Sequence, residues 1–277
     1  MEKKTADGQI IIVLTEHPVL GALLIPYLAE TSEDGTVLLM EQAFHASPET
    51  TANLSEAERR AIDIASHYTE RYLMGIYSRE KTVSHFLHKL SEDQERVKTV
   101  VRPFIEKKLS EMLELIRSSH LPLYQKQAGS KMLYAHHAYR VHPAPVESRF
   151  IFRTDDHSFR YKLNCFYNGE PFSLTDRKPV VVLNSSPAIL LLGMDLYFFS
   201  HIESARLLPF TKKDIVSVET AQMEKYIDNI LIPTARYHET TIYGLDIQEE
   251  QRTCQPELAI EDTVYNEQML RLDFRYG

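Results

Sequence analysis

A chain of 277 residues buries roughly 70 to 75% of its unfolded surface on folding, which allows a substantial hydrophobic core. Hydrophobic residues make up 43% and charged residues 25% of the sequence, and these globular averages exclude a disordered, collagen-like or coiled-coil chain. The net charge of -8 comes from acidic surpluses at both ends, so the chain as a whole lacks the positive charge typical of nucleic-acid-binding modules.

Residues 1–54 predict a small N-terminal α/β segment. Residues 9–14 form a short apolar run rich in β-branched side chains, as in a buried strand. A Glu-Asp-Gly turn at 33–35 precedes a second apolar run at 37–40. We therefore expect two strands with a helix or a turn between them.

The sequence predicts neither a membrane span nor a disulfide framework. The longest largely apolar stretch, 19–29, has 11 residues and contains a proline, whereas a membrane span needs about 20 residues. The apolar run that follows Lys3 and Lys4 is too short for a signal peptide. Cys165 and Cys254 lack the spacing of a stapled secreted domain. These observations favour a cytoplasmic protein.

Residues 55–127 predict a helical block of two or three helices. Ser55 and Glu58 have the spacing of a capping box, and apolar residues then recur every three or four positions. A second helix cap is predicted at Ser91. We expect Pro103 to kink or divide the last helix, because proline removes a backbone donor.

Residues 128–277 predict a larger, β-rich α+β domain. Apolar and polar side chains alternate over 149–153 and 159–163 around a polar turn, which indicates a β-hairpin. Further elements follow along the chain: strands at 180–183 and 188–192, an amphipathic helix at 220–232, and a second hairpin from 258–260 and 270–276. Because the last strand runs to the end, we expect the parent polypeptide to continue past Gly277. The predicted fold class is mixed α+β.

No catalytic constellation is recognisable in the sequence. The nine glycines are too widely spaced for GxxxxGK[ST] or GxGxxG, the loops that cradle phosphates. No GxSxG nucleophile elbow occurs, and Ser185 and Ser186 lie between Asn184 and Pro187 in a cluster typical of a turn. We predict no catalytic residue and no cofactor site in this chain.

Histidines provide the candidate metal ligands. The two groups are His136, His137 and His142, and His85 with His88 one helical turn apart. HExxH, HxH and paired-cysteine motifs are absent, and if residues 133–141 form a strand, His136 and His137 point to opposite faces. A structural or surface role is favoured over metal binding.

Two acidic motifs have simpler explanations than metal binding. Asp155 and Asp156 beside His157 occupy the tip of the predicted hairpin, where Asp is favoured by turn geometry. The ExK pattern at residues 106–108 resembles that of a nuclease core but falls in a predicted helix. We predict no metal site from either motif.

The strongest surface candidate is the basic side of the predicted hairpin. Four basic residues occupy alternating positions on its strands: Arg149, Arg153, Arg160 and Lys162. Phe159, Tyr161 and Leu163 alternate with them and are expected to point inward. Two interpretations remain open, a solvated sheet face or contact with the phosphates of a nucleic acid.

Four hydrophobic segments occur in a characteristic order. They are Ile11-Ile-Val-Leu-Thr-Glu-His-Pro-Val-Leu-Gly21, Phe159-Arg-Tyr-Lys-Leu163 with Asn168-Gly169, Leu208-Pro-Phe210, and Pro256-Glu-Leu-Ala-Ile260 to Leu270-Arg-Leu-Asp-Phe-Arg-Tyr276. Together they resemble the N-terminal region that precedes the motor in bacterial helicases of the Swi/Snf type. The segments are spread over most of the chain, and their order carries the resemblance.

The resemblance implies a parent enzyme that hydrolyses ATP while it translocates on duplex DNA. ATP, Mg²⁺ and the arginine fingers would belong to two C-terminal motor lobes, and this sequence contains none of their motifs. The chain would then be a non-catalytic accessory region that contacts its own motor, DNA or a protein partner, and no membrane. Two alternatives remain: a free-standing module that binds protein or nucleic acid, and an enzyme with an unrecognised metal or carboxylate site.

Overall fold

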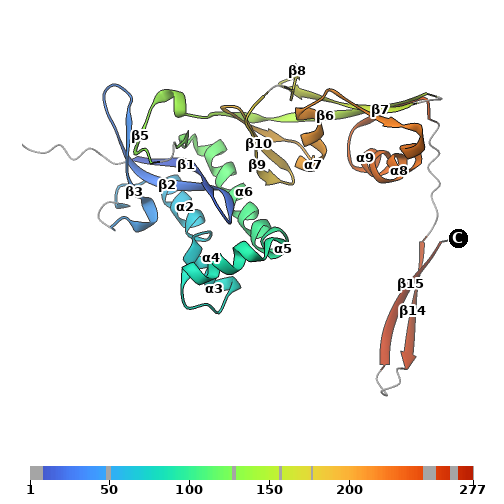
Figure 1. Cartoon of the computed structure of the whole chain (residues 1–277), viewed down its shortest axis with the longest axis horizontal. Coiled ribbons are helices and arrows are strands. Elements are labelled where there is room, and N and C mark those ends of the chain that lie inside the picture. The colour runs from blue at the N-terminus through green and yellow to red at the C-terminus, as the bar shows by residue number, and fades with distance from the viewer. Residues whose placement is uncertain are drawn as a thin grey trace, which may run out of the picture. The chain divides into compact units, whose positions relative to one another are not determined.

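The computed structural model describes residues 9–47, 51–126, 129–155, 158–175, 177–245, 254–262 and 268–276. The chain divides into two compact units, residues 1–243 and 244–277. The larger unit combines a five-stranded and an eight-stranded sheet with helices, and the smaller unit contains a two-stranded sheet (Figure 1). The predicted α+β class is confirmed. One hydrophobic core joins side chains from all three segments that the sequence predicts, from Ile10 to Phe198.

The first sheet begins with an antiparallel meander. Its strands are β1 (Gln9–His17), β2 (Gly21–Thr31), β3 (Val37–Gln42), β4 (Leu123–Gln125) and β5 (Met132–Leu133), in the order β4-β1-β2-β3-β5. The expectation of only a helix or turn before β3 is wrong, because β2 occupies that stretch. Most of β2 is buried, so it lacks the alternation of a half-exposed strand. Pro26 is tolerated because β3 pairs with β2 only from Tyr27 onward.

The helices between β3 and β4 occupy the predicted block, but they outnumber the two or three expected, and one predicted cap is misplaced. They are α2 (Glu56–Ser66), α3 (Glu70–Tyr77), α4 (Val83–Glu92), α5 (Gln94–Arg96) and α6 (Arg102–Ser119), preceded by the 3-10 turn η1 (Ala43–His45). The capping box of Ser55 and Glu58 is confirmed. The cap predicted at Ser91 is wrong: Asp93 caps α5 by accepting from the Arg96 N–H, while the Ser91 hydroxyl donates to the His88 carbonyl.

The predicted division near Pro103 takes the form of a π-helical turn. This turn, η2 (Val97–Val101), joins α5 to α6, and Pro103 lies in the first turn of α6. The helix continues from η2 into α6, where the Arg102 N–H donates to the Val97 carbonyl, so the residue before Pro103 marks a change of helix type rather than a free helix end.

The second sheet contains the predicted hairpin. Its strands are β6 (Arg140–Asp155), β7 (Ser158–Tyr167), β8 (Glu170–Phe172), β9 (Val180–Ser185), β10 (Ala188–Leu192), β11 (Asp195–Phe199), β12 (Ile215–Glu219) and β13 (Thr240–Tyr243). The main order is β12-β7-β6-β11-β10-β9, with β8 paired to β7 and β13 paired to β6. The hairpin of β6 and β7 is confirmed and extends beyond its predicted length.

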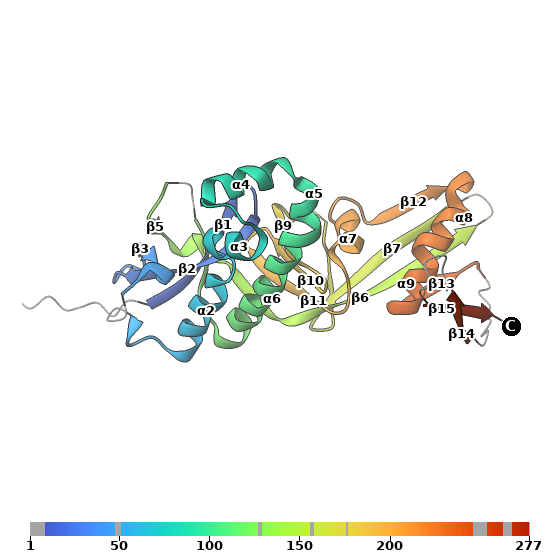
Figure 2. The same ribbon diagram turned by 90° about the horizontal axis from the view of Figure 1, so that it is seen from below.

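Short helices cover one side of this hairpin. They are α7 (Ser204–Leu207), η4 (Leu208–Thr211), η5 (Thr220–Gln222), α8 (Met223–Tyr226), the π-helical turn η6 (Ile227–Leu231) and α9 (Ile232–Tyr237). Phe150, Phe152 and Phe159 point toward these helices and are buried, and the Phe210 ring of η4 packs against Phe150. Figures 1 and 2 show α7, α8 and α9 on the same side of the long strands. The opposite side is therefore open to solvent at this end of the unit.

The smaller unit is the second predicted hairpin. Strands β14 (Cys254–Asp262) and β15 (Gln268–Tyr276) pair antiparallel, with Leu258 opposite Leu272. Within the described part of the chain, no helix has the length and apolar character needed to cross a bilayer.

Candidate nucleic-acid interface

Strand register brings all four predicted basic residues to one side of the second sheet. Arg153 on β6 lies directly opposite Arg160 on β7, and Ile151 lies opposite Lys162. Arg149 is on the same side, four residues before Arg153, since alternate residues of a strand share a face. We call this open side of β6, β7, β12 and β13 the basic face.

Three cations of the basic face have no acidic partner among the described side chains. Arg149 forms an ion pair with Glu239, which precedes β13. No described carboxylate lies within 4.0 Å of the charged groups of Arg153, Arg160 or Lys162. Like charges directly opposite each other destabilise a sheet, so the Arg153 and Arg160 pair opposes folding. A bound anion would reduce the repulsion between these two guanidinium groups.

Apolar and aromatic side chains lie between these cations. Ile215 on β12 is opposite Lys162, and Tyr243 on β13 is beside Arg153. The Arg153 Cζ atom lies 5.4 Å from the centre of the Tyr243 ring, which is a cation–π contact. A hollow of about 230 Å³ opens here, lined by Ile151, Arg153, Arg160, Tyr161, Lys162 and Ile215.

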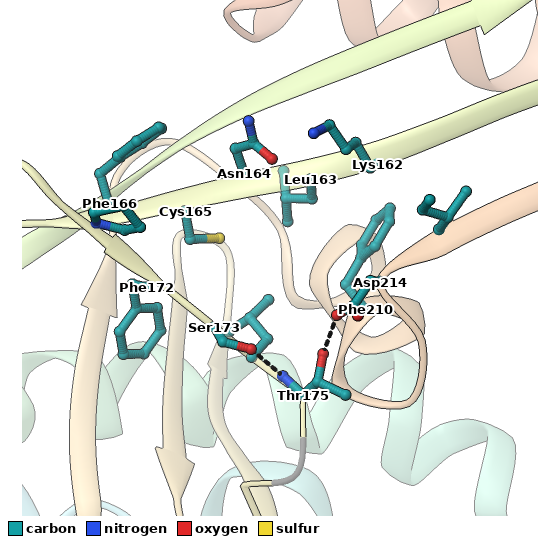
Figure 3. A pocket seen from close by; sticks show the side chains of 13 residues that line it. Lys162, Leu163, Asn164, Cys165, Phe166, Phe172, Ser173, Thr175, Phe210 and Asp214 are labelled. Atoms are coloured by element: carbon teal, nitrogen blue, oxygen red, sulfur yellow. Dashed lines mark hydrogen bonds between the residues drawn. The ribbon is translucent and has the colours of Figure 1, made fainter.

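A second cavity lies on the other side of β7. It has a volume of about 510 Å³ and is lined by β7, β8, residues 173–175, η4 and the start of β12 (Figure 3). Figure 3 shows Lys162 and Asn164 pointing away from it, on the side of the basic face. Burial raises the pKa of the Cys165 thiol to about 12, so this thiol stays protonated at neutral pH. The cavity therefore offers no activated sulfur nucleophile.

The structure corrects the prediction for His136 and His137. Residues Ala135–His137 form the 3-10 turn η3 rather than a strand, and the two imidazole rings meet edge to face with centroids 4.2 Å apart. Burial and the neighbouring His136 lower the pKa of His137, which favours its neutral form. No group of three metal-ligating side chains occurs in the residues that the structure describes.

The other candidate ligands have ordinary partners where they are described. His85 lies 4.0 Å from Glu80, and His88 lies 3.6 Å from Glu92. The side chains of Asp155, Asp156 and His157 lie outside the described residues.

The two remaining candidates from the sequence, the serine pair at 185–186 and the ExK pattern at 106–108, have hydrogen bonds that stabilise the fold. The predicted turn lies between β9 and β10: Ser185 is the last residue of β9, Ser186 and Pro187 form the turn, and the Asn184 side chain donates to the Pro187 carbonyl. Glu106 of the ExK pattern lies in α6, as predicted, where it accepts from the Ser185 N–H and pairs with Arg102. Neither arrangement has the geometry of a catalytic site.

One polar cluster was missed from the sequence. Asp195 at the start of β11 accepts two 2.8 Å hydrogen bonds from Arg140 and a third 2.8 Å contact from Nε2 of His142. Burial alone would raise the pKa of Asp195, but these hydrogen bonds outweigh it and lower the pKa. The Tyr197 ring stacks on His142 at 4.3 Å. The sequence shows that Arg140 and His142 are two positions apart and share a strand face, but their partner Asp195 lies more than 50 residues away.

Comparisons with protein-family models, curated proteins and solved structures found no match to this chain. The functional conclusion therefore depends on the geometry of the basic face.

Proposed function

We propose that this chain is a non-catalytic accessory region of a Swi/Snf-type helicase and contacts DNA through the basic face. One observation supports the DNA contact above all others: register places Arg153 opposite Arg160, with Lys162 beside them, and none of the three has a described acidic partner. Exposed cations that are not neutralised internally bind phosphates with release of counterions. A cytoplasmic location fits this role.

The net charge of -8 does not prevent such a contact. At physiological ionic strength, charges more than about 8 Å apart are largely screened, so a phosphate responds mainly to nearby side chains. The acidic surplus instead makes non-specific binding elsewhere on the chain unfavourable. Binding should thus be localised to the basic face.

Salt dependence of DNA binding tests the proposal. The full chain is titrated into fluorescein-labelled oligonucleotides at several salt concentrations, and binding is followed by fluorescence anisotropy. Three phosphate contacts predict a slope of log K against log salt of about -2 to -3. The double variant R153A/R160A should bind more weakly and lose roughly 1.5 to 2 of that slope.

A matched control removes the same charge elsewhere. Lys98 and Lys107 are exposed on η2 and α6, far along the chain from the basic face. K98A/K107A should keep most of the affinity and the slope. Equal losses in both double variants, or no loss in R153A/R160A, would contradict the DNA contact.

The link to a helicase has an independent test. The reading frame after Gly277 is expected to encode a GxxxxGK[ST] loop soon downstream, since the motor of such an enzyme must bind ATP phosphates. A stop codon at that point would favour the alternative, a free-standing binding module without enzymatic activity.

A further inference from the structure

Register arranges the central part of the basic face into two rows that cross four strands. One row contains Thr241, Ile151, Lys162 and Ile215, and the next contains Tyr243, Arg153, Arg160 and Ser217. Neighbouring strands lie about 4.8 Å apart, so Lys162 and Arg153 each have an apolar or aromatic neighbour at close range, whereas Arg160 lies between Arg153 and Ser217. Lys162 in particular lies between two isoleucines. The face is consequently mixed in character rather than purely charged.

Two of the apolar groups are open to solvent. Ile215 is 51% exposed and Tyr243 is 49% exposed. The hollow of about 230 Å³ is lined by Ile151, Ile215 and the three cations that have no acidic partner among the described side chains. Its apolar floor and charged rim match a ligand that combines a flat apolar group with negative charge on either side.

We propose that the basic face binds single-stranded DNA, with one unpaired base in the hollow over Ile151 and Ile215 and a neighbouring base on the Tyr243 ring. Phosphates on either side of the seated base contact Arg153, Arg160 and Lys162. This inference rests on the proposed DNA contact and specifies which form of DNA the face takes.

The apolar groups favour a single strand over a duplex. In a duplex the bases are stacked inside and the sugar-phosphate backbone faces the protein, so Ile151, Ile215 and Tyr243 would meet charged groups. A single strand can turn its bases onto the protein, where they stack on aromatic rings and cover apolar surface while the backbone follows the cations. Of the two forms, only the single strand covers the exposed apolar groups while its phosphates contact the cations.

The first experiment compares ligands at one salt concentration. The full chain is titrated with a labelled oligothymidine, with an abasic deoxyribose-phosphate oligomer of the same length, and with a duplex of the same length. Base contacts predict that oligothymidine binds at least about fivefold more tightly than the abasic oligomer, and more tightly than the duplex. Oligouridine of the same length should bind no more tightly, and a preference for it would overturn the choice of DNA.

The second experiment removes the apolar groups without changing charge. I215T and Y243A should each weaken oligothymidine binding by roughly 5-fold to 100-fold, leave the salt slope unchanged, and leave binding of the abasic oligomer unchanged. The controls L38T and Y237A alter an exposed leucine on β3 and an exposed tyrosine on α9, outside the basic face. Both should bind as the unmodified chain does. Thermal unfolding of each variant shows whether the fold is retained, and the unmodified chain with the three ligands provides a test that needs no variant.

The outcomes separate this inference from the proposed function. Equal affinity for oligothymidine and the abasic oligomer, with a salt slope that still depends on Arg153 and Arg160, would overturn the base-binding hollow and leave the phosphate contact intact. Stronger binding of the duplex than of oligothymidine would likewise overturn the base-binding hollow and leave the phosphate contact intact. Absence of binding to all three ligands would overturn both proposals.

Discussion

Arg102 stabilises the turn at Gly21: its Nη1 atom lies 3.4 Å from the position that a Cβ would take on this glycine. The same nitrogen donates 3.0 Å hydrogen bonds to the carbonyls of Leu20 and Ala22, on both sides of Gly21. Nδ1 of His17, the last residue of β1, accepts a hydrogen bond from the Leu20 N–H in the turn. The segment 11–21, which contributes to the helicase resemblance, therefore forms β1 and the turn that α6 holds against the sheet.

Gly21→Ala is expected to destabilise the protein through its backbone angle. Gly21 has a φ of +79°, a region that costs an L-residue roughly 1 to 2 kcal/mol. The Arg102 contact is at ordinary van der Waals distance and should add little. Gly35→Ala, at the same φ with open space around it, should lose a similar free energy of unfolding in urea titrations. Gly75→Ala in the exposed part of α3 should instead gain about 0.5 to 1 kcal/mol.

A second prediction concerns Glu58, which links α2 to β1. Its Oε1 accepts a 2.9 Å hydrogen bond from the buried Ile10 N–H, and its Oε2 accepts a 2.8 Å bond from the Ser55 N–H. Ser55→Ala removes only the helix cap and should cost about 1 kcal/mol. Glu58→Ala also leaves the Ile10 N–H without a partner and should cost about 2 to 3 kcal/mol. Equal losses in urea unfolding would show that the Ile10 bond contributes nothing.

Elements with one buried face and one exposed face could be predicted from the sequence, because their apolar and polar residues alternate with the period of the element. The β6 and β7 hairpin alternates Arg153 and Arg160 with Phe152 and Phe159, so its period, its inner side and the shared face of its cations are visible in the sequence. Likewise Ser55 and Glu58 are local partners, three residues apart. In both cases the interacting residues lie within one hairpin or one helical turn.

Unpredicted features depend on burial from both sides or on distant pairing. β2 is buried along most of its length, so its apolar run shows no strand period. The parallel pairing of β6 with β11, which brings Asp195 to Arg140, joins strands separated along the chain by β7, β8, β9 and β10. Ile215 and Tyr243 reach the basic face through the same kind of long-range pairing. Their place beside the cations was therefore not visible from the sequence.

The ionised carboxylate of Asp195 is expected to stabilise the fold, and this contribution should be lost in acid. Its pKa is lower in the folded chain than in the unfolded chain, because Arg140 and His142 donate to the carboxylate. Stabilisation is therefore complete above the unfolded pKa of about 3.9 and is lost as the pH falls through the lower folded value. D195N should have a lower Tm at pH 7 and a shallower fall in Tm below about pH 4. The control D228N removes an exposed carboxylate of η6 that is in no ion pair of the described residues, and its Tm at pH 7 should match that of the unmodified chain.

Glu239 is predicted to limit DNA binding by neutralising Arg149. The two side chains form an ion pair beside the basic face, and both remain largely exposed. E239Q should release Arg149 for a phosphate, strengthen binding, and steepen the slope of log K against log salt by about 0.7 to 0.9. R149A should have a small effect in the unmodified chain but should abolish this gain in the E239Q background.

The matched control for this last prediction is E92Q. Glu92 pairs with His88 on α4 at 3.6 Å, so its replacement changes the net charge by the same amount away from the basic face. Anisotropy titrations at several salt concentrations should show the steeper slope for E239Q and not for E92Q. Because a purely global charge effect would act equally in both variants, equal gains would show that Arg149 does not reach the bound DNA.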